Sequence, residues 1–271
     1  TIWDKDDARG DYFGFSVSIT DNYAIVGAYG NDSTMGSAYI YKRQVNTDGS
    51  ESWPQQQKII STNAIPGIQF GISVSINGGY AIVGADGNVS NNDLDNTAGS
   101  AYIFKLQVNT DGSESWTQQN KLVADDGGND DHFGSSVSIN GNYAMVGVPN
   151  DDDNGTNSGS AYAYEREVDN DGSDIWYTRP KLVANNGYSN DHFGASVSIN
   201  GNYAIVGAFG VNSNSGAAYI YEVKSEGSWT KLSEIKASDT AKGDSFGYSV
   251  GINDNYVIVG APYKNDNGET S

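Results

Sequence analysis

The sequence contains no cysteine, which excludes a disulfide framework and a thiolate metal site. Basic residues are also scarce: 15 Lys and Arg stand against 34 Asp and Glu, so the formal net charge is −19 at pH 7. A negative field of this size repels nucleic acids and anionic membranes, and we therefore expect neither as a partner. No apolar run reaches the roughly 18 residues that a membrane-inserted helix needs.

Proline and glutamate are rare as well, with five Pro and eight Glu in 271 residues. The other 26 acidic residues are Asp, which favours turns and hard-cation sites, so the acidity is expected in loops. A hydrophobic content of 37%, with 11% aromatic residues, is enough for a packed core and predicts a folded protein. The first residues do not resemble a signal peptide, and we expect any export signal to have been removed.

One segment occurs five times along the chain. It reads FGFSVSITDNYAIVGA in its first copy, and the copies start at Phe13, Phe70, Phe133, Phe193 and Phe246. Successive copies are 57, 63, 60 and 53 residues apart, so loops vary in length while the segment itself is constant. Self-similarity at such a period predicts one supersecondary unit in each repeat.

Each unit is predicted to contain four short antiparallel strands. The first strand alternates large and small side chains from Phe13 to Ile19, which is a period of two. An Asn-Gly or Asp-Asn step, as at Asn140-Gly141, suits a tight type I′ turn into the second strand. A third strand begins at Gly-Ser-Ala-Tyr or a variant of it. The fourth carries a Trp that lies 17 residues before the next Phe-Gly.

This pattern predicts an all-β fold, a five-bladed β-propeller built from four-stranded antiparallel blades. The Gly and Ser of the first strand are interpreted as packing residues that make room for the Phe and Val of a neighbouring blade. The Tyr that opens each second strand is interpreted as interblade packing with a polar tip at the rim. These tyrosines are Tyr23, Tyr80, Tyr143, Tyr203 and Tyr256.

The Phe-Gly pairs, the Val-Gly-Ala-Pro at 259–262 and the GSAYIY at 36–41 resemble FG-GAP repeats, the blades of the integrin α-subunit propeller and of many bacterial surface proteins. The resemblance covers all five units and implies a single propeller domain over residues 1–271. It further implies that the Phe-Gly strand is innermost and that the protein is extracellular or at the cell surface. At the proline position the other copies have Tyr29, Asp86, Pro149 and Phe209.

In that strand order, the fifth blade has its first two strands but no third, so the last blade is predicted to be incomplete in this chain. Residues 1–5 align with an outermost strand that could close the ring by joining the fifth blade. Two explanations remain open for the missing strand. The favoured one is that the chain is part of a longer protein, and the other is that a second chain fills the slot by strand addition.

Two kinds of polar residue precede the Phe-Gly pairs. His132 and His192 occupy equivalent positions about a blade width apart, roughly 10 to 20 Å, and are interpreted as loop residues bonded to the backbone rather than ligands of one metal. Asp residues lie two positions before the Phe in four copies, at Asp11, Asp131, Asp191 and Asp244. They are interpreted either as local caps for backbone N–H groups or as one acidic, ligand-binding face.

Calcium is the metal that the composition favours, because it takes six to eight oxygen ligands. In calcium-binding FG-GAP blades the acidic loop joins the first two strands, where this chain has a bare turn, so the resemblance implies that the usual site is absent. Two other acidic segments are candidates, 151–155 and 169–174. Their candidate ligands are Asp151, Asp153, Asp169, Asp171 and Asp174.

No catalytic centre can be assembled from the sequence. Neither His has an evident nucleophile, and there is no nucleophile elbow or phosphate-binding loop. We therefore expect a non-catalytic extracellular binding or adhesion module whose acidic loops bind a glycan or an extracellular protein, with Ca²⁺ as the one cofactor considered. Two alternatives stay open: a structural module that self-assembles by strand addition from another chain, and a glycan-cleaving propeller enzyme with paired carboxylates.

Overall fold

The computed structural model describes residues 10–31, 35–62, 65–87, 98–184 and 187–264. Within them the chain forms four four-stranded antiparallel sheets and two two-stranded sheets. Each four-stranded sheet comes from one sequence repeat and is a propeller blade. A short helical turn, α2 (Val211–Asn214), lies between β16 (Tyr203–Ala208) and β17 (Ala217–Val223). The predicted all-β propeller is confirmed.

The blades are numbered here by repeat, and their strands are given from the innermost outward. Blade 1 contains β1 (Ser16–Ile19), β2 (Tyr23–Ala28), β3 (Ser37–Lys42) and β6 (Gln55–Ile59), and blade 2 contains β7 (Ser73–Asn77), β8 (Tyr80–Ala85), β9 (Ser100–Val108) and β10 (Glu114–Leu122). Blade 3 contains β11 (Ser136–Asn140), β12 (Tyr143–Val148), β13 (Ser160–Val168) and β14 (Asp174–Thr178), and blade 4 contains β15 (Phe193–Asn200), β16 (Tyr203–Ala208), β17 (Ala217–Val223) and β18 (Trp229–Ile235). Blade 5 contributes β19 (Ser249–Ile252) and β20 (Val257–Gly260), while β4 (Gln44–Val45) and β5 (Glu51–Ser52) extend blade 1 as a small hairpin.

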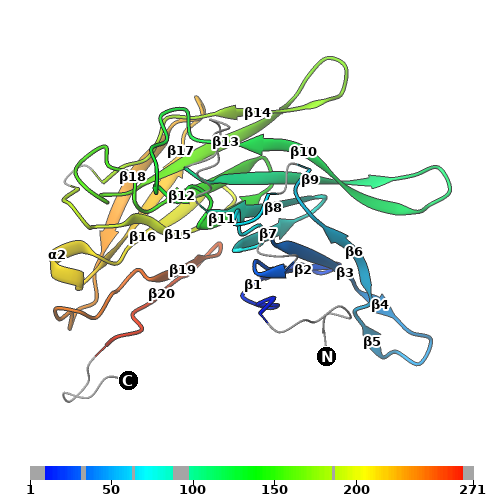
Figure 1. Ribbon diagram of the computed structural model, residues 1–271, viewed down its shortest axis with the longest axis horizontal. Helices are drawn as coiled ribbons and strands as arrows, with labels where there is room; N and C mark the ends of the chain where they lie inside the picture. The colour runs from blue at the N-terminus through cyan, green and yellow to red at the C-terminus, as the bar shows by residue number, and fades with distance from the viewer. Residues whose placement is uncertain (1–9, 32–34, 63–64, 88–97, 185–186, 265–271) are drawn as a thin grey trace.

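The first strand of every blade lies toward the centre of the molecule. Along the series, β1 packs on β7, β7 on β11, β11 on β15 and β15 on β19. Figure 1 shows these strands gathered in the middle and the hairpins β4–β5, β9–β10 and β13–β14 at the periphery. The structure thus confirms that the Phe-Gly strand is innermost and that the described part of blade 5 has two strands. The outermost strand predicted over residues 1–5 lies outside the described residues.

The hydrophobic core lies between blades. One cluster joins Ile25 and Ile40 of blade 1 to Val83 and Tyr102 of blade 2. Equivalent clusters join blade 2 to blade 3 and blade 3 to blade 4. Since both faces of an interior blade are covered in this way, the second strands are apolar at successive positions, as in YAIVGA, rather than alternating.

Serines of the inner strands bond each blade to the next. Ser16 Oγ donates a 2.8 Å hydrogen bond to the carbonyl of Gly71, and the N–H of Ile76 donates to Ser18 Oγ at 3.1 Å. The first bond recurs from Ser73 to Gly134 at 2.7 Å and from Ser196 to Gly247 at 2.9 Å. The second recurs from Ile139 to Ser75 at 3.1 Å, from Ile199 to Ser138 at 3.0 Å and from Ile252 to Ser198 at 3.3 Å.

The sequence-based interpretation of these small residues is therefore wrong in one respect. The inner-strand serines do not face the Phe ring of the neighbouring blade: the ring of Phe70 lies 5.4 Å from Tyr102 of its own blade and meets blade 1 in the hydrophobic cluster at Ile40 and near Gly36. Ser16 of the inner strand bonds the backbone carbonyl of Gly71 in the neighbouring blade instead, and Gly27 of the second strand makes room for that carbonyl. A Cβ on Gly27 would lie 2.0 Å from the carbonyl oxygen of Gly71, so this position requires glycine.

Three of the tyrosines that open the second strands, Tyr23, Tyr80 and Tyr143, bridge blades at the rim, as the sequence predicts, whereas Tyr203 and Tyr256 are exposed. Tyr23 meets Trp116 of blade 2 edge to face at 5.4 Å and donates a 2.9 Å hydrogen bond to Glu114 of the same strand. Tyr80 repeats both contacts with Trp176 and Asp174 of blade 3. The three junctions among blades 1 to 4 therefore combine an inner backbone ladder, an apolar middle and a polar rim.

Candidate functional site at the axial mouth

A depression of about 400 Å³ lies where the blades converge at one end of the propeller. Its lining comes from blades 1, 3, 4 and 5, and consists of Phe15, Ser135, Pro149, Asn150, His192, Ala195, Phe209 and Tyr248. Residues so far apart in the sequence meet here because equivalent loops of successive blades all reach the axis. We call this depression the axial mouth.

Three positions of the repeat supply most of the lining. Phe15 and Tyr248 directly follow a Phe-Gly pair, His192 directly precedes one, and Pro149 and Phe209 stand at the proline position of the family motif. These positions differ from copy to copy, whereas the strands around them are nearly constant. The constant residues build the junctions, and the variable ones give the mouth its chemistry.

Aromatic rings dominate one side of the mouth. His192 stacks on Phe209 with centroids 4.7 Å apart and an interplanar angle of 12°, and Phe209 lies 5.6 Å from Tyr248. Tyr248 in turn contacts Tyr263 at 6.3 Å. The rings of Tyr248 and Tyr263 are each about half exposed. The mouth therefore presents a continuous aromatic surface to solvent.

A second aromatic group reaches the mouth from blade 1. Phe15 packs edge to face on Tyr29 at 4.7 Å, and Tyr29 stacks on Tyr12, also at 4.7 Å. Phe15 and Tyr12 are each 58% exposed, which is high for rings of this size and leaves them accessible to a ligand.

The backbone holds the residue before each Phe-Gly in the left-handed region. The φ angles lie between 53° and 62° for Tyr12, Gln69, His132, His192 and Ser245. A non-glycine residue in this region costs roughly 1 to 2 kcal/mol, which the surrounding junctions must offset in all five repeats. Each blade therefore has the same strained turn before its Phe-Gly pair, but the side chain at this position differs between blades.

The two histidines are bonded to backbone carbonyls, as the sequence predicts, but in different environments. The Nδ1 of His132 lies 3.2 Å from the carbonyl of Asp86 and 3.7 Å from its carboxylate, which raises the pKa of His132. The Nδ1 of His192 lies 3.2 Å from the carbonyl of Pro149, and burial lowers the pKa of His192. At neutral pH the stacked His192 therefore contributes an uncharged ring to the mouth.

The four Asp residues before the Phe-Gly pairs are buried beneath their loops. The carboxylates of Asp131, Asp191 and Asp244 each accept the backbone N–H three residues earlier, at 2.6 to 2.8 Å. Asp11 accepts a 3.0 Å hydrogen bond from the side-chain amide of Asn31. Burial raises the pKa of Asp131 and of Asp191. These carboxylates shape the loops around the mouth, and other side chains form its surface.

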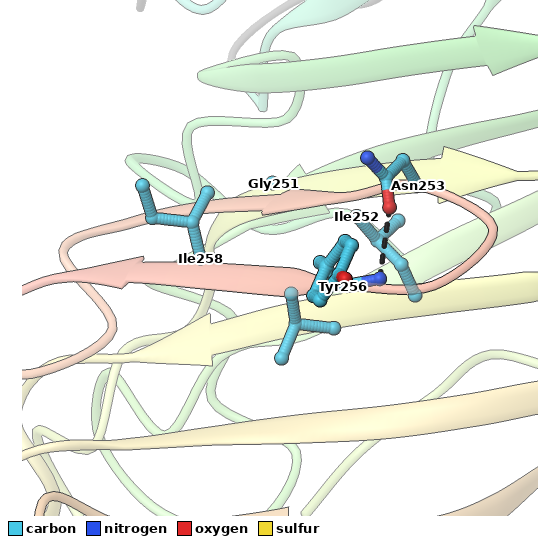
Figure 2. Close-up of a pocket in the computed structure, with 6 residues that line it drawn as sticks. Gly251, Ile252, Asn253, Tyr256 and Ile258 are labelled. Carbon is cyan, nitrogen blue, oxygen red and sulfur yellow. Dashed lines mark hydrogen bonds between the residues drawn. The ribbon is translucent and has the colours of Figure 1, made fainter.

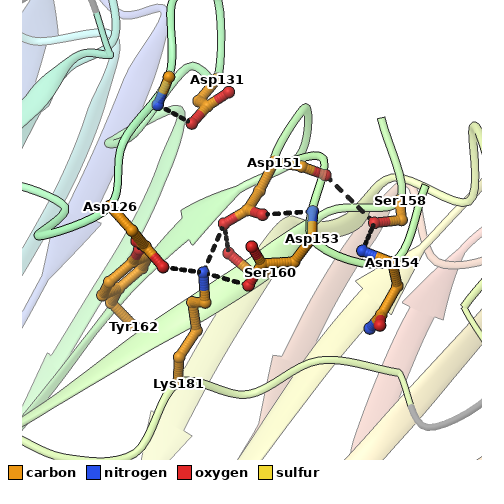
Figure 3. A network of polar contacts seen from close by, with 10 residues as sticks. Asp126, Asp131, Asp151, Asp153, Asn154, Ser158, Ser160, Tyr162 and Lys181 are labelled. Atoms are coloured by element: carbon orange, nitrogen blue, oxygen red, sulfur yellow. Dashed lines mark hydrogen bonds and ion pairs between the residues drawn. The ribbon is translucent and has the colours of Figure 1, made fainter. Parts of the chain in front are cut away.

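The candidate metal ligands of segment 151–155 surround an ammonium group. The Nζ of Lys181 lies 2.5 Å from Asp153, 3.1 Å from Asp151 and 2.7 Å from Asp126 (Figure 3). Burial lowers the pKa of Lys181, but the hydrogen bonds to these three carboxylates outweigh it and raise the pKa overall. Asp151 also accepts a 2.7 Å bond from Ser160, so most of its acceptor capacity is used within the protein.

The candidate ligands of segment 169–174 are not brought together. The carboxylates of Asp169 and Asp171 accept backbone N–H groups of their own exposed turn, from Asn170 and Ser173. Asp174 is buried between blades 2 and 3, where it pairs with Lys105 at 2.6 Å and Arg166 at 2.8 Å. Among the described residues, no group of three or more His, Asp and Glu side chains is arranged to hold a metal ion.

The sequence pattern of the FG-GAP repeat matches residues 1–41, 53–104, 116–164, 176–221 and 229–271. The chain belongs to the FG-GAP repeat family. FG-GAP repeats form β-propeller modules that mediate binding, are typically non-catalytic and are typical of extracellular and surface proteins. A comparison with curated proteins finds no match. No helix in the described ranges is long and apolar enough to span a bilayer.

The axial mouth of this FG-GAP propeller is a site that the sequence-based reasoning did not identify. The polar residues that precede the Phe-Gly pairs are the Asp residues, which lie buried beneath the loops. The signal that could have led to the mouth is the set of copy-to-copy differences: Phe15 and Tyr248 stand where the other repeats have Ile72, Ser135 and Ala195, and the proline position carries an aromatic residue at Tyr29 and Phe209. Phe15, Phe209 and Tyr248, at positions that differ between repeats, all line the axial mouth at one end of the propeller.

Proposed function

We propose that this FG-GAP propeller is a non-catalytic extracellular module that binds a glycan at the axial mouth. The observation that carries the proposal is the exposed aromatic surface formed by Phe209, Tyr248 and Phe15 around a depression of about 400 Å³. A pyranose ring has an apolar C–H face and a polar hydroxyl edge. Apolar walls with a few polar groups are the usual composition of a small-ligand site.

The polar groups of the mouth suit the hydroxyl edge of a sugar. Asn150 offers an amide donor and acceptor, and Ser135 offers a hydroxyl group. His192 adds a neutral ring nitrogen at pH 7. With a net charge of −19, a neutral or cationic glycan is favoured over a strongly anionic one, because the field of the whole protein opposes the approach of negative charge.

Direct binding measurements with single-site variants test the proposal. Wild-type protein is screened on an array of neutral, basic and acidic polysaccharides, and the best ligand is measured by calorimetry against Phe209→Ala and Tyr248→Ala. Each variant is expected to lower the affinity at least tenfold. Tyr177→Ala is the matched control, since Tyr177 is exposed on the outer strand β14 and should bind as wild type. Absence of any glycan binding, or equal losses in the control, would contradict the proposal.

Calcium assistance remains a prediction, and the same assay addresses it. If segments 151–155 and 169–174 bind Ca²⁺, a chelator will weaken glycan binding or lower the melting temperature. The Nζ of Lys181 lies 3.1 Å from Asp151 and 2.5 Å from Asp153. If this ammonium group takes the place of a metal ion there, the chelator will change neither the glycan affinity nor the melting temperature. Chromatography of the recovered glycan distinguishes binding from cleavage, because a glycan-cleaving enzyme would release shorter products.

A further inference from the structure

The junctions between successive blades are nearly the same in their inner layer. The following face of a blade packs on the next blade along the chain, and its preceding face packs on the blade before it. In blades 1 to 4, a Cβ on the second-strand glycine would lie 1.9 to 2.0 Å from the carbonyl oxygen of the Phe-Gly glycine in the next blade. Because this contact recurs at every described junction, it cannot distinguish one blade from another.

The apolar middle layer is also nearly constant. The inner strands of blades 2 to 5 all carry a Val and an Ile two residues apart, which are Val74 and Ile76 in blade 2. The second strands all carry a Tyr and, except for Met145 in blade 3, an Ile two residues later. Figure 2 shows this pair on blade 5, where Tyr256 and Ile258 line a groove of about 330 Å³. The middle layer of one blade would therefore fit that of any other.

The rim differs between junctions, and at the first one it joins a lysine to an acid of the next blade. Lys42 lies opposite Tyr23 in the pairing of β2 with β3. Lys42 and Tyr23 donate to the same carboxylate oxygen of Glu114 in blade 2, at 2.8 and 2.9 Å. The hydrogen bond from Lys42 is the largest cause of a lowered pKa of Glu114, so this acid is ionised at neutral pH.

The second junction has the same kind of rim. Lys105 lies opposite Tyr80 in the pairing of β8 with β9. The acid of the next blade is Asp174, which lies 2.6 Å from Lys105 and accepts a 2.6 Å hydrogen bond from Tyr80. The side chain of Asp174 is only 2% exposed, so this pairing is almost completely removed from water. Blades 1 and 2 therefore both present a lysine to an acid.

The third junction carries the opposite charge at the lysine position. Glu165 lies opposite Tyr143 in the pairing of β12 with β13, and it pairs with Arg179 of its own blade at 2.9 Å. The position of the acid in blade 4, two residues before the outer-strand Trp, is Gly227. A Cβ there would lie 2.7 Å from Nε of Arg179 and 2.8 Å from Oε2 of Glu165. The glycine therefore leaves the space that this ion pair occupies.

We propose that the rim determines which blade faces fit together. A following face with a lysine, as on blades 1 and 2, fits a preceding face with an acid, as on blades 2 and 3. The following face of blade 3, with Glu165, fits the preceding face of blade 4, where Gly227 leaves room and adds no charge. Each rim is thus an interaction surface whose partner is one class of blade face in the same chain. The residues involved do not line the axial mouth, so the inference is independent of glycan binding.

Wrong combinations of blade faces fail for two reasons. If the following face of blade 3 met the preceding face of blade 2, Glu114 would take the place of Gly227, where a Cβ alone comes within 2.8 Å of Glu165. The carboxylate of Glu114 would also add a second negative charge. If the following face of blade 1 met blade 4, Lys42 and Tyr23 would lose their shared acceptor. Such pairings arise when blades exchange between two chains, a characteristic failure of repeat proteins.

Refolding of charge-reversal variants tests the proposal. Lys42→Glu places two glutamates at the first rim, and Glu114→Lys places two lysines there. After refolding from urea, each single variant should give less monomer than wild type and more dimer with exchanged blades, as measured by size-exclusion chromatography. The double variant restores opposite charges and should recover the monomer. Its folding equilibrium constant should exceed the value expected from adding the two single effects by about fivefold or more.

Two controls separate pairing specificity from net charge and from stability. Lys242→Glu changes the net charge as Lys42→Glu does, but Lys242 is exposed in the loop before β19 and should refold as wild type. Val74→Ala removes apolar contacts from the middle layer of the same junction and lowers stability. Since all junctions share that layer, Val74→Ala should not increase the exchanged dimer.

The deciding comparison is made at urea concentrations where Val74→Ala and Lys42→Glu are equally stable. A larger fraction of exchanged dimer in Lys42→Glu, with recovery of the monomer in the double variant, supports the proposal. Equal dimer fractions in the two single variants would show that the rim contributes only stability, and would overturn it. Failure of the double variant to recover the monomer would overturn it as well.

Discussion

Replacement of Gly84 by Ala tests whether backbone contact between blades holds the propeller together. Gly84 lies in β8, and an added Cβ would be 1.9 Å from the carbonyl oxygen of Gly134 in blade 3. An ordinary contact begins at 3.4 Å, so the two backbones would have to separate by about 1.5 Å. The carbonyl cannot move alone, because it accepts the 2.7 Å bond from Ser73.

The loss of stability in Gly84→Ala can be worked out from the contacts that are broken when the backbones of blades 2 and 3 separate. It removes the Ser73 hydrogen bond and strains the Ile139 to Ser75 bond beside it, each with a net value of about 1 kcal/mol. Overpacking of a tight core adds about 1 to 3 kcal/mol. We expect Gly84→Ala to lower the free energy of unfolding by about 3 to 5 kcal/mol, a large fraction of the stability of a typical domain.

Urea unfolding followed by Trp fluorescence measures the loss, with Gly260→Ala as the control. Gly260 occupies the same repeat position in blade 5, where the added Cβ would meet only the Oγ of Ser249 at 2.3 Å, and that hydroxyl can rotate away. The control should lose less than about 1 kcal/mol, the value of one hydrogen bond. Equal losses in the two variants, or a neutral Gly84→Ala, would refute the reasoning.

Three further predictions concern ionisable groups. In an NMR titration His132 should titrate above 6.5, because of its contact with Asp86, and His192 below 6.5, because of burial; equal values would contradict this. His132 thus contributes to the free energy of unfolding below pH 6.5, and this contribution is lost as the pH rises through its folded pKa. His192 has the opposite dependence: its contribution is present above pH 6.5 and is lost as the pH falls through its folded pKa. Burial raises the pKa of Asp174, but bonds from Lys105, Tyr80 and Arg166 outweigh it and lower the pKa overall, so Asp174→Asn should cost about 3 kcal/mol at pH 7 in urea unfolding and progressively less as the pH falls below 3.8. Lys181→Met leaves three carboxylates near one another and should be most destabilising at pH 7, with the deficit shrinking in melting curves toward pH 3; a pH-independent deficit would indicate lost packing instead.

The fold is recoverable from the sequence because its signals are local and occur five times. The alternation from Phe13 to Ile19 and the Asn140-Gly141 turn are properties of a few neighbouring residues, and each copy supports the others. The rim role was also assigned correctly for Tyr23, Tyr80 and Tyr143, since a half-polar aromatic at a strand start has few other roles, but Tyr203 and Tyr256 are exposed because no outer-strand Trp is described beside them. The serines were not assigned correctly, because a hydrogen bond from Ser16 to Gly71 joins residues 55 positions apart and leaves no trace in local periodicity.

By itself, the sequence determined the repeat and the four-stranded blade, which follow from short-range alternation and turn chemistry, while the inner position of the Phe-Gly strand was implied by the resemblance to FG-GAP repeats. Only the tertiary structure decided which loop residues meet. It buried the four Asp residues, three of them as caps of backbone N–H groups, placed Lys181 among the candidate calcium ligands and gathered Phe15, Phe209 and Tyr248 from three blades at one mouth. The physical reason is that a ring brings together positions about 60 residues apart, and their contacts depend on how the blades are arranged around the axis.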